Sequence, residues 1–169
     1  MIIWNGNTAK RGALSPELYE CIDSAIKLAA DPRIRAVILT SEGGFFCAGG
    51  NLNVLIERRQ LSETQRRGKV DELHDLLRGI RACPVPVIAA VNGIACGGGL
   101  ELALSADMIL AADHASFALP EIRSGTVADA ASVKLPKRIP YHIAMELLLT
   151  GRWFDVNEAK GWGLVNEIL

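Results

Sequence analysis

The sequence lacks several features that would assign it to a protein class at once. It has four cysteines, but no C-x-x-C pair and no histidine spacing suited to zinc, so neither a disulfide framework nor a zinc module is expected. The formal net charge is −1, which excludes a bulk attraction to nucleic acid or to an anionic membrane surface. We therefore expect free thiols, no nucleic-acid partner, and any phosphate-bearing ligand to be held by local geometry.

An uninterrupted apolar run is also missing. Residues 85–100 carry no charge, but a proline, an Asn-Gly pair and three consecutive glycines interrupt them, and Glu101 follows. A membrane helix tolerates these residues poorly together, whereas a buried strand, a tight turn and a glycine-rich approach to a helix accommodate them. Residues 1–12 lack the basic start and the apolar stretch of a signal peptide. The expectation is a cytoplasmic protein without a membrane partner.

The overall composition indicates one soluble globular domain over residues 1–169. Half of the residues are apolar and 22% are charged, which is a balance that supports a single hydrophobic core. Helix patterns and short apolar runs alternate, and this alternation predicts an α/β fold. Expected helices cover residues 15–30, 62–82, 97–106 and 141–149, with one more opening at 155–158; expected strands cover 35–40, 86–91, 108–112, 115–119 and 164–169.

Two glycine-rich segments are the strongest candidates for a functional site. Residues 46–52 (FCAGGNL) follow one expected strand, and residues 97–103 (GGGLELA) follow another. Amides at the start of a helix are unpaired and carry partial positive charge, so two such ends facing each other would offer two N–H donors to one oxygen. The alternative is that the glycines only permit tight turns. Neither segment has the glycine spacing of a phosphate-binding loop.

Glu101 and Glu121 are candidate acid–base residues. Glu101 lies among leucines and alanine, and Glu121 follows an apolar stretch and Pro120. Partial burial raises the pKa of a carboxyl group toward the range used in acid–base catalysis. Taken singly, each glutamate is more often an ordinary helix cap or surface residue than a catalytic group. The catalytic interpretation depends on both glutamates lying downstream of the three consecutive glycines at 97–99.

Four segments together resemble the crotonase superfamily. AVNGIACGGGLELALSADMILAADHASFALPE resembles the pattern A-x-x-G-x-A-x-G-G-G-x-E-L-A…D…F-x-x-P-E, and FFCAGGNL resembles F-x-A-G-x-D-[LI]. RGALSPEL and TGRWFDVNEAKGWGLVNEIL match two further family segments in the same order. The resemblance implies a right-handed spiral of ββα units. It also implies that the family's first strand is mostly absent here and that most of its C-terminal helical trimerisation region is missing from this chain.

The resemblance further implies roles for eight residues. Gly50 and Gly98 would supply the oxyanion-hole amides, and Glu101 and Glu121 would activate water and deliver a proton. Four residues correspond to positions around bound coenzyme A: Arg11, Ala48, Gly49 and Gly97. No metal and no redox cofactor is implied, because coenzyme A is part of the thioester substrate. A homo-oligomer, either a trimer or a hexamer, is expected.

The activity implied is addition of water to a 2-enoyl-CoA or the reverse reaction, and two alternatives stay open. An isomerase would depend mainly on Glu121, whereas a non-catalytic acyl-CoA-binding protein or partner subunit would need neither glutamate. The sequence departs from the family pattern at three places: Asn51 replaces an aspartate, Gly12 replaces an asparagine, and residues 123–131 follow Glu121 with one residue fewer than the pattern has.

Overall fold

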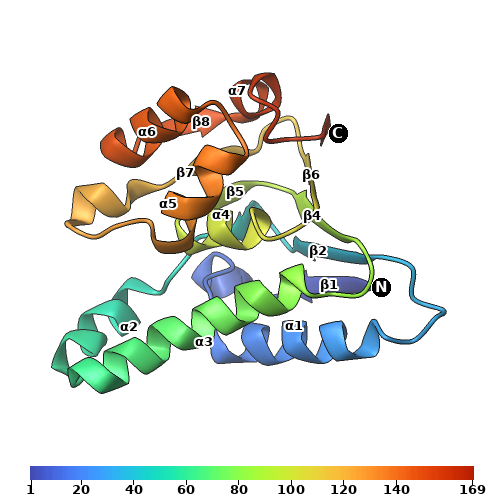
Figure 1. The fold of residues 1–169 in the computed structure, drawn as a ribbon, viewed down its shortest axis with the longest axis horizontal. Coiled ribbons are helices and arrows are strands. Elements are labelled where there is room, and N and C mark those ends of the chain that lie inside the picture. Colours follow the sequence, from blue (N-terminus) through green and yellow to red (C-terminus); the bar gives the residue numbers. More distant parts are fainter.

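The computed structural model describes residues 1–169, apart from the side chain of Leu52. It contains two β-sheets that are flanked by helices (Figure 1). The strands of the larger sheet are β1 (Ile2–Asn5), β2 (Val37–Ser41), β4 (Val87–Val91), β6 (Met108–Ala111) and β9 (Glu167–Ile168). The strands of the smaller sheet are β3 (Phe45–Cys47), β5 (Ile94–Cys96), β7 (Ser116–Ala118) and β8 (Trp153–Asp155).

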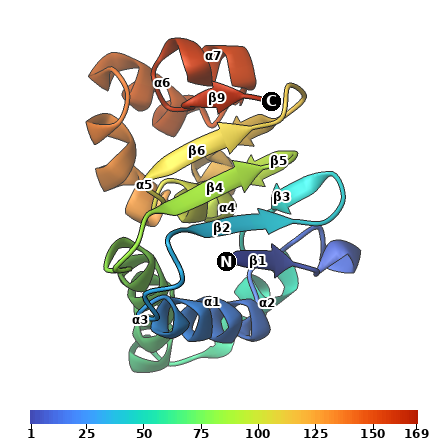
Figure 2. The same ribbon diagram turned by 90° about the vertical axis from the view of Figure 1, so that its right-hand side faces the viewer.

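The larger sheet is parallel throughout, in the order β1-β2-β4-β6-β9 (Figure 2). Its central strands are rich in Val, Ile and Ala, and alternate residues of β4 (Val87, Ala89 and Val91) are buried. Each of β2, β4 and β6 is followed after a short connection by a strand of the smaller sheet. These successive strand pairs, separated by helices, give the expected α/β spiral of ββα units.

Several helices begin at a residue whose side chain caps them. The helices are α1 (Pro16–Leu28), α2 (Leu52–Glu57), α3 (Glu63–Arg81), α4 (Gly98–Ala103), α5 (Asp129–Lys134), α6 (Tyr141–Thr150) and α7 (Val156–Gly161), with short 3-10 turns between several of them. The Ser15 side chain accepts a hydrogen bond from Leu18 N–H, and capping boxes open α3 at Ser62 and α7 at Asp155. Within the described part of the chain, no helix is long and apolar enough to cross a membrane.

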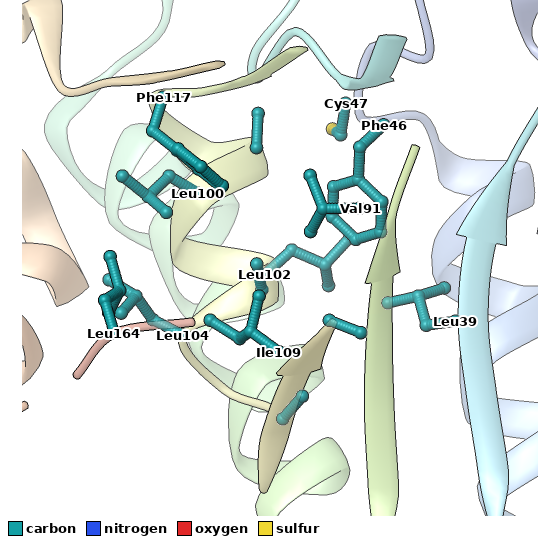
Figure 3. Close-up of a cluster of buried hydrophobic side chains, with 14 of the residues drawn as sticks. Leu39, Phe46, Cys47, Val91, Leu100, Leu102, Leu104, Ile109, Phe117 and Leu164 are labelled. Atoms are coloured by element: carbon teal, nitrogen blue, oxygen red, sulfur yellow. The ribbon is translucent and has the colours of Figure 1, made fainter. Parts of the chain in front are cut away.

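The hydrophobic core joins α4 to both sheets. Leu100, Leu102 and Leu104 are buried at or just beyond this short helix, among side chains from strands of the larger and smaller sheets (Figure 3). Phe117 of β7 stacks on Phe154 of β8 with their ring centroids 5.3 Å apart. This packing fixes α4, and with it Glu101, relative to the ends of the smaller sheet.

Several expectations about local structure were wrong. No strand was expected within residues 41–50, 92–96 or 150–155, yet these residues contain β3, β5 and β8. The strand β1 near the start of the chain was not anticipated either, and it pairs with β2 along all four of its residues. These short strands are stabilised by pairing with distant segments, which a local pattern does not reveal.

Candidate active site

The candidate residues gather at the carboxyl ends of β3, β5 and β7. These three strands are parallel neighbours, with β5 in the middle. Gly49 and Gly50 follow β3, Gly97 and Gly98 follow β5, and Glu121 lies in the 3-10 turn after β7. Because parallel strands end at the same edge of a sheet, segments far apart in the sequence meet here.

The two glycine-rich segments are in direct contact. A β-carbon built on Gly49 would lie 3.1 Å from the backbone nitrogen of Gly98, and one built on Gly98 would lie 4.0 Å from the nitrogen of Gly50. Gly49 has a φ of +83°, a conformation that L side chains rarely adopt. No described backbone carbonyl accepts a hydrogen bond from the amide of Gly50 or of Gly98. Both N–H groups are therefore free to donate to a ligand oxygen.

Glu101 is a buried carboxyl with one defined partner. It lies in the first turn of α4 with 3% of its surface exposed, and its Oε1 accepts a hydrogen bond of 2.8 Å from the Ala131 N–H. Burial raises the pKa of Glu101, and the negative charges of Glu121 and Asp129 add to this effect. The Ala131 hydrogen bond and Lys134 act in the opposite direction. The apolar setting predicted from the sequence is confirmed.

Glu121 is the second candidate carboxyl group, and one of its oxygens lacks a hydrogen-bond partner in the part of the chain that the structure describes. Its Oε2 is buried and has no hydrogen-bond partner among the described residues. Burial raises the pKa of Glu121, and a hydrogen bond from its own backbone N–H acts in the opposite direction. Its Oε1 lies against Gly97, since a β-carbon there would be 2.6 Å away. A buried polar atom without a partner is uncommon in a native fold, and a site for a bound molecule accounts for it.

A cavity of about 370 Å³ adjoins the glycine segments. Leu14 and Asn51 form part of its lining; the Leu14 side chain also lies next to Gly98, and Asn51 follows Gly50. Charged groups from Lys10, Arg58 and Lys69 line it further out, together with acidic residues. Neither candidate glutamate lines this cavity.

The other predicted binding residues lie at the same edge. The Ala48 N–H donates a hydrogen bond of 3.1 Å to the Arg11 carbonyl, which joins these two residues. The Arg11 guanidinium lies 5.7 Å from the centre of the Phe45 ring, and its side chain is exposed. Gly49 and Gly97 are buried at the ends of β3 and β5. No cluster of metal-ligating side chains occurs among the residues whose side chains are described.

The places where the sequence departs from the family pattern have local explanations. Asn51 caps α2, its side chain accepting a hydrogen bond from Asn53 N–H, and asparagine and aspartate cap helices equally well. Residues 123–131 include the start of α5, which carries the amide bound to Glu101. Ala131 was not predicted as a site residue, because a backbone donor leaves no signal in the sequence.

Comparison with known proteins shows which family the chain resembles along most of its length. The enoyl-CoA hydratase/isomerase family pattern matches residues 7–169. The chain is 45% identical over 156 residues to the carnitinyl-CoA dehydratase of Proteus mirabilis, which covers 89% of this chain and 57% of that protein. It is 43% identical over 153 residues to the Escherichia coli K12 protein of the same name. The chain thus spans a little over half the length of these relatives.

Solved structures show the same fold. The enoyl-CoA hydratase from Polaromonas sp. JS666 superimposes with a TM-score of 0.94 at 37% identity, covering 99% of this chain and 66% of that one. The enoyl-CoA hydratase from Bacillus anthracis gives a TM-score of 0.91 at 36% identity, covering 99% of this chain and 65% of that one. With the crotonase fold and the family pattern along nearly its whole length, the chain belongs to the enoyl-CoA hydratase/isomerase family.

Proposed function

We propose that this chain forms the acyl-CoA site of a hydratase or dehydratase that adds water to a 2-enoyl-CoA or removes it from a 3-hydroxyacyl-CoA. One observation carries the proposal: two unpaired amides, the buried Glu101 carboxyl and the half-buried Glu121 carboxyl, both with raised pKa values, meet at one edge of the smaller sheet. Family membership supports the reaction class, and the relatives named carnitinyl-CoA dehydratase support dehydration as one direction.

The amides of Gly50 and Gly98 form the oxyanion hole in this proposal. They donate to the thioester carbonyl oxygen, which gains negative charge when water adds at C3 and the electrons of the C2=C3 bond move toward the carbonyl. Fixed donors stabilise that charge without reorganising during the reaction. Gly49 and Gly97 keep the two segments close, since a side chain at either position would strike backbone or carboxylate atoms.

Glu101 and Glu121 handle water and its protons. One carboxylate takes a proton from the water as its oxygen bonds to C3, and a proton is delivered to C2 of the enolate; dehydration reverses these steps. Raised pKa values suit such exchange near neutral pH, because proton transfer is most efficient when donor and acceptor are closely matched. The unpartnered Oε2 of Glu121 is the atom best placed to accept a hydrogen bond from water.

Coenzyme A enters as part of the substrate, held by Arg11, Ala48 and their neighbours. The exposed Arg11 guanidinium offers a cation to a phosphate, and the backbone around Ala48 offers polar contacts to the adenine. No metal or redox cofactor is needed for this chemistry. The relatives' name makes carnitinyl-CoA and its dehydration product the first acyl groups to test, with crotonyl-CoA as the simple reference.

The test is turnover of crotonyl-CoA and carnitinyl-CoA by the wild-type chain and by Glu101→Gln and Glu121→Gln. We expect each variant to lose at least about 10²-fold in kcat while still binding the thioester. Loss in Glu121→Gln alone would indicate isomerase chemistry instead. Thioester binding by a wild-type protein with no turnover would indicate a non-catalytic binding protein.

We also propose self-association into a trimer or hexamer. Ile122, Leu149 and Trp153 are exposed apolar side chains, and exposed apolar surface commonly marks an interface. Sedimentation at micromolar concentration tests this, and a monomer there would contradict it.

A further inference from the structure

The short helix α5 is linked by hydrogen bonds both to the side chain of Glu101 and, through Ser105, to the backbone of Glu101. Ala131, the third residue of α5, donates its N–H to Glu101 Oε1 at 2.8 Å, and neither residue is more than 3% exposed. The first-turn amides of a helix have no partner within the helix, so Glu101 caps α5 from 30 residues earlier in the chain. The start of α5 has no capping side chain of its own, because Ala128 occupies that position.

The last residue of α5 reaches the backbone of Glu101. Lys134 Nζ donates to the Ser105 hydroxyl at 2.5 Å, and that hydroxyl donates to the Glu101 carbonyl at 2.8 Å. Ser105 is buried, with 2% of its surface exposed, and Lys134 is partly buried. The ammonium group of Lys134 therefore ties the end of α5 to the turn of α4 that carries the carboxyl.

The first residue of α5, Asp129, is bound to the helix α3. His74 of α3 lies with its Nε2 2.8 Å from Oδ2 of Asp129, across 55 residues of sequence. Figure 1 shows α4 and α5 next to each other, with the long helix α3 crossing below them. One end of α5 is thus fixed to α3 and the other to Ser105, just beyond α4, and the amide that binds Glu101 lies between these ends.

We propose that α5 positions the Glu101 carboxyl for reaction, and that His74 and Lys134 are positioning residues that act through this helix. The catalytic part of this inference rests on the proposed function, whereas the structural part does not. A small displacement of a reacting group costs rate without removing substrate contacts, and about 1 Å can cost about 10²-fold. Loosening α5 should therefore lower kcat and leave KM unchanged.

The experiment compares His74→Ala, Lys134→Met and the conservative His74→Gln, whose amide can still donate to Asp129. His114→Ala is the matched control, because His114 makes a similar contact of 3.0 Å to Asp113 on the exposed surface, away from α5. The readouts are hydrogen exchange of the Ala131 amide by NMR, exchange of amides in β4, and kcat and KM for the enoyl-CoA substrate.

We expect His74→Ala and Lys134→Met to speed Ala131 exchange by about tenfold or more while β4 exchange stays unchanged. Their kcat should fall by about tenfold with KM within twofold, His74→Gln should recover both values, and His114→Ala should match the wild type. Unchanged Ala131 exchange, or equal loss of protection in β4, would overturn the positioning role. If the wild type shows no turnover, the proposed function fails while the exchange measurement still decides whether α5 is held in this way.

Discussion

The Glu121 carboxylate lies directly against the backbone of Gly97, so closely that a β-carbon on this glycine would be 2.6 Å from Oε1. The contact joins the segment after β5 to the turn after β7. It also leaves Oε2 buried and unpartnered, whereas Glu101 has the Ala131 amide. Of the two carboxylates, Glu121 is the less well stabilised when ionised, and this makes it a source of instability as well as a candidate for chemistry.

Glu121→Gln should therefore stabilise the folded chain at pH 8. Burial raises the pKa of Glu121 above the usual 4.5, so the unfolded chain ionises first as pH rises and folding stability is lost through that interval. The Glu121→Gln side chain is neutral at every pH, so this variant does not lose folding stability in that interval. We expect Tm to rise by about 2–4 °C at pH 8, the shift that about 1 kcal/mol produces in a chain of this size, and to stay unchanged at about pH 3, below both pKa values. Thermal melts at both pH values measure this.

Glu20→Gln serves as the control, because Glu20 is exposed on α1. It should leave Tm unchanged at pH 8. A Glu121→Gln variant that melts at or below the wild-type temperature at pH 8 would mean that the ionised carboxylate is not destabilising in the folded chain.

Gly98→Pro and Gly98→Ala separate the loss of an amide donor from the addition of a side chain. Gly98 is the first residue of α4, where proline costs the helix no hydrogen bond. Both variants place a β-carbon 2.8 Å from Leu14 Cδ1, but only proline removes the N–H. We expect Gly98→Pro to have a kcat about 10²–10³ lower than that of Gly98→Ala, and equal rates would exclude this amide from the oxyanion hole.

Gly99→Ala tests the contact between α4 and β3. A β-carbon on Gly99 would lie 2.0 Å from the Cys47 carbonyl oxygen, and buried backbone cannot move aside cheaply. We expect a loss on the order of 4 kcal/mol or more, seen as an unfolded or insoluble protein. Gly68→Ala is its counterpart in α3, where no atom lies within 4 Å. It should stabilise the chain by about 0.5–1 kcal/mol in urea unfolding, because alanine loses less backbone entropy.

Local signals predicted much of this fold, and long-range contacts account for what they missed. Ser15, Ser62 and Asp155 open helices as expected, because a cap acts within three or four residues. The three-residue strands β3 and β8 depend on partners elsewhere in the chain and have no periodicity of their own.

The candidate site likewise has features that the local sequence predicts and features that depend on distant residues. The glycine segments and the apolar surroundings of Glu101 and Glu121 were readable from the sequence, although pairing these groups in one site depended on the resemblance. Trp4 and Trp153 are about half exposed, since each lies on the outward face of its strand. The contact between His74 and Asp129 of α5 could not be predicted, because it joins residues 55 positions apart.

Cys96 should report the charge on Glu121. Burial raises the pKa of the Cys96 thiol to about 11, and the Glu121 carboxylate contributes to this shift. Burial also raises the pKa of Cys47 to about 11, but Glu121 is not among its causes. Only the thiolate is alkylated, so Glu121→Gln should speed alkylation of Cys96 at pH 9 by roughly two- to threefold and leave Cys47 unchanged.

Mass spectrometry of iodoacetamide-treated protein distinguishes the sites, and exposed Cys21 should be alkylated first in both proteins. A general loosening of the fold would accelerate Cys47 and Cys96 together, whereas a change of charge accelerates Cys96 alone. Equal Cys96 rates in the two proteins would mean that Glu121 carries no negative charge at pH 9 or lies too far away to act. Either result would remove Glu121 from the proposed pair of carboxylates, because that pair requires a titrating carboxyl beside the segment that holds Gly97.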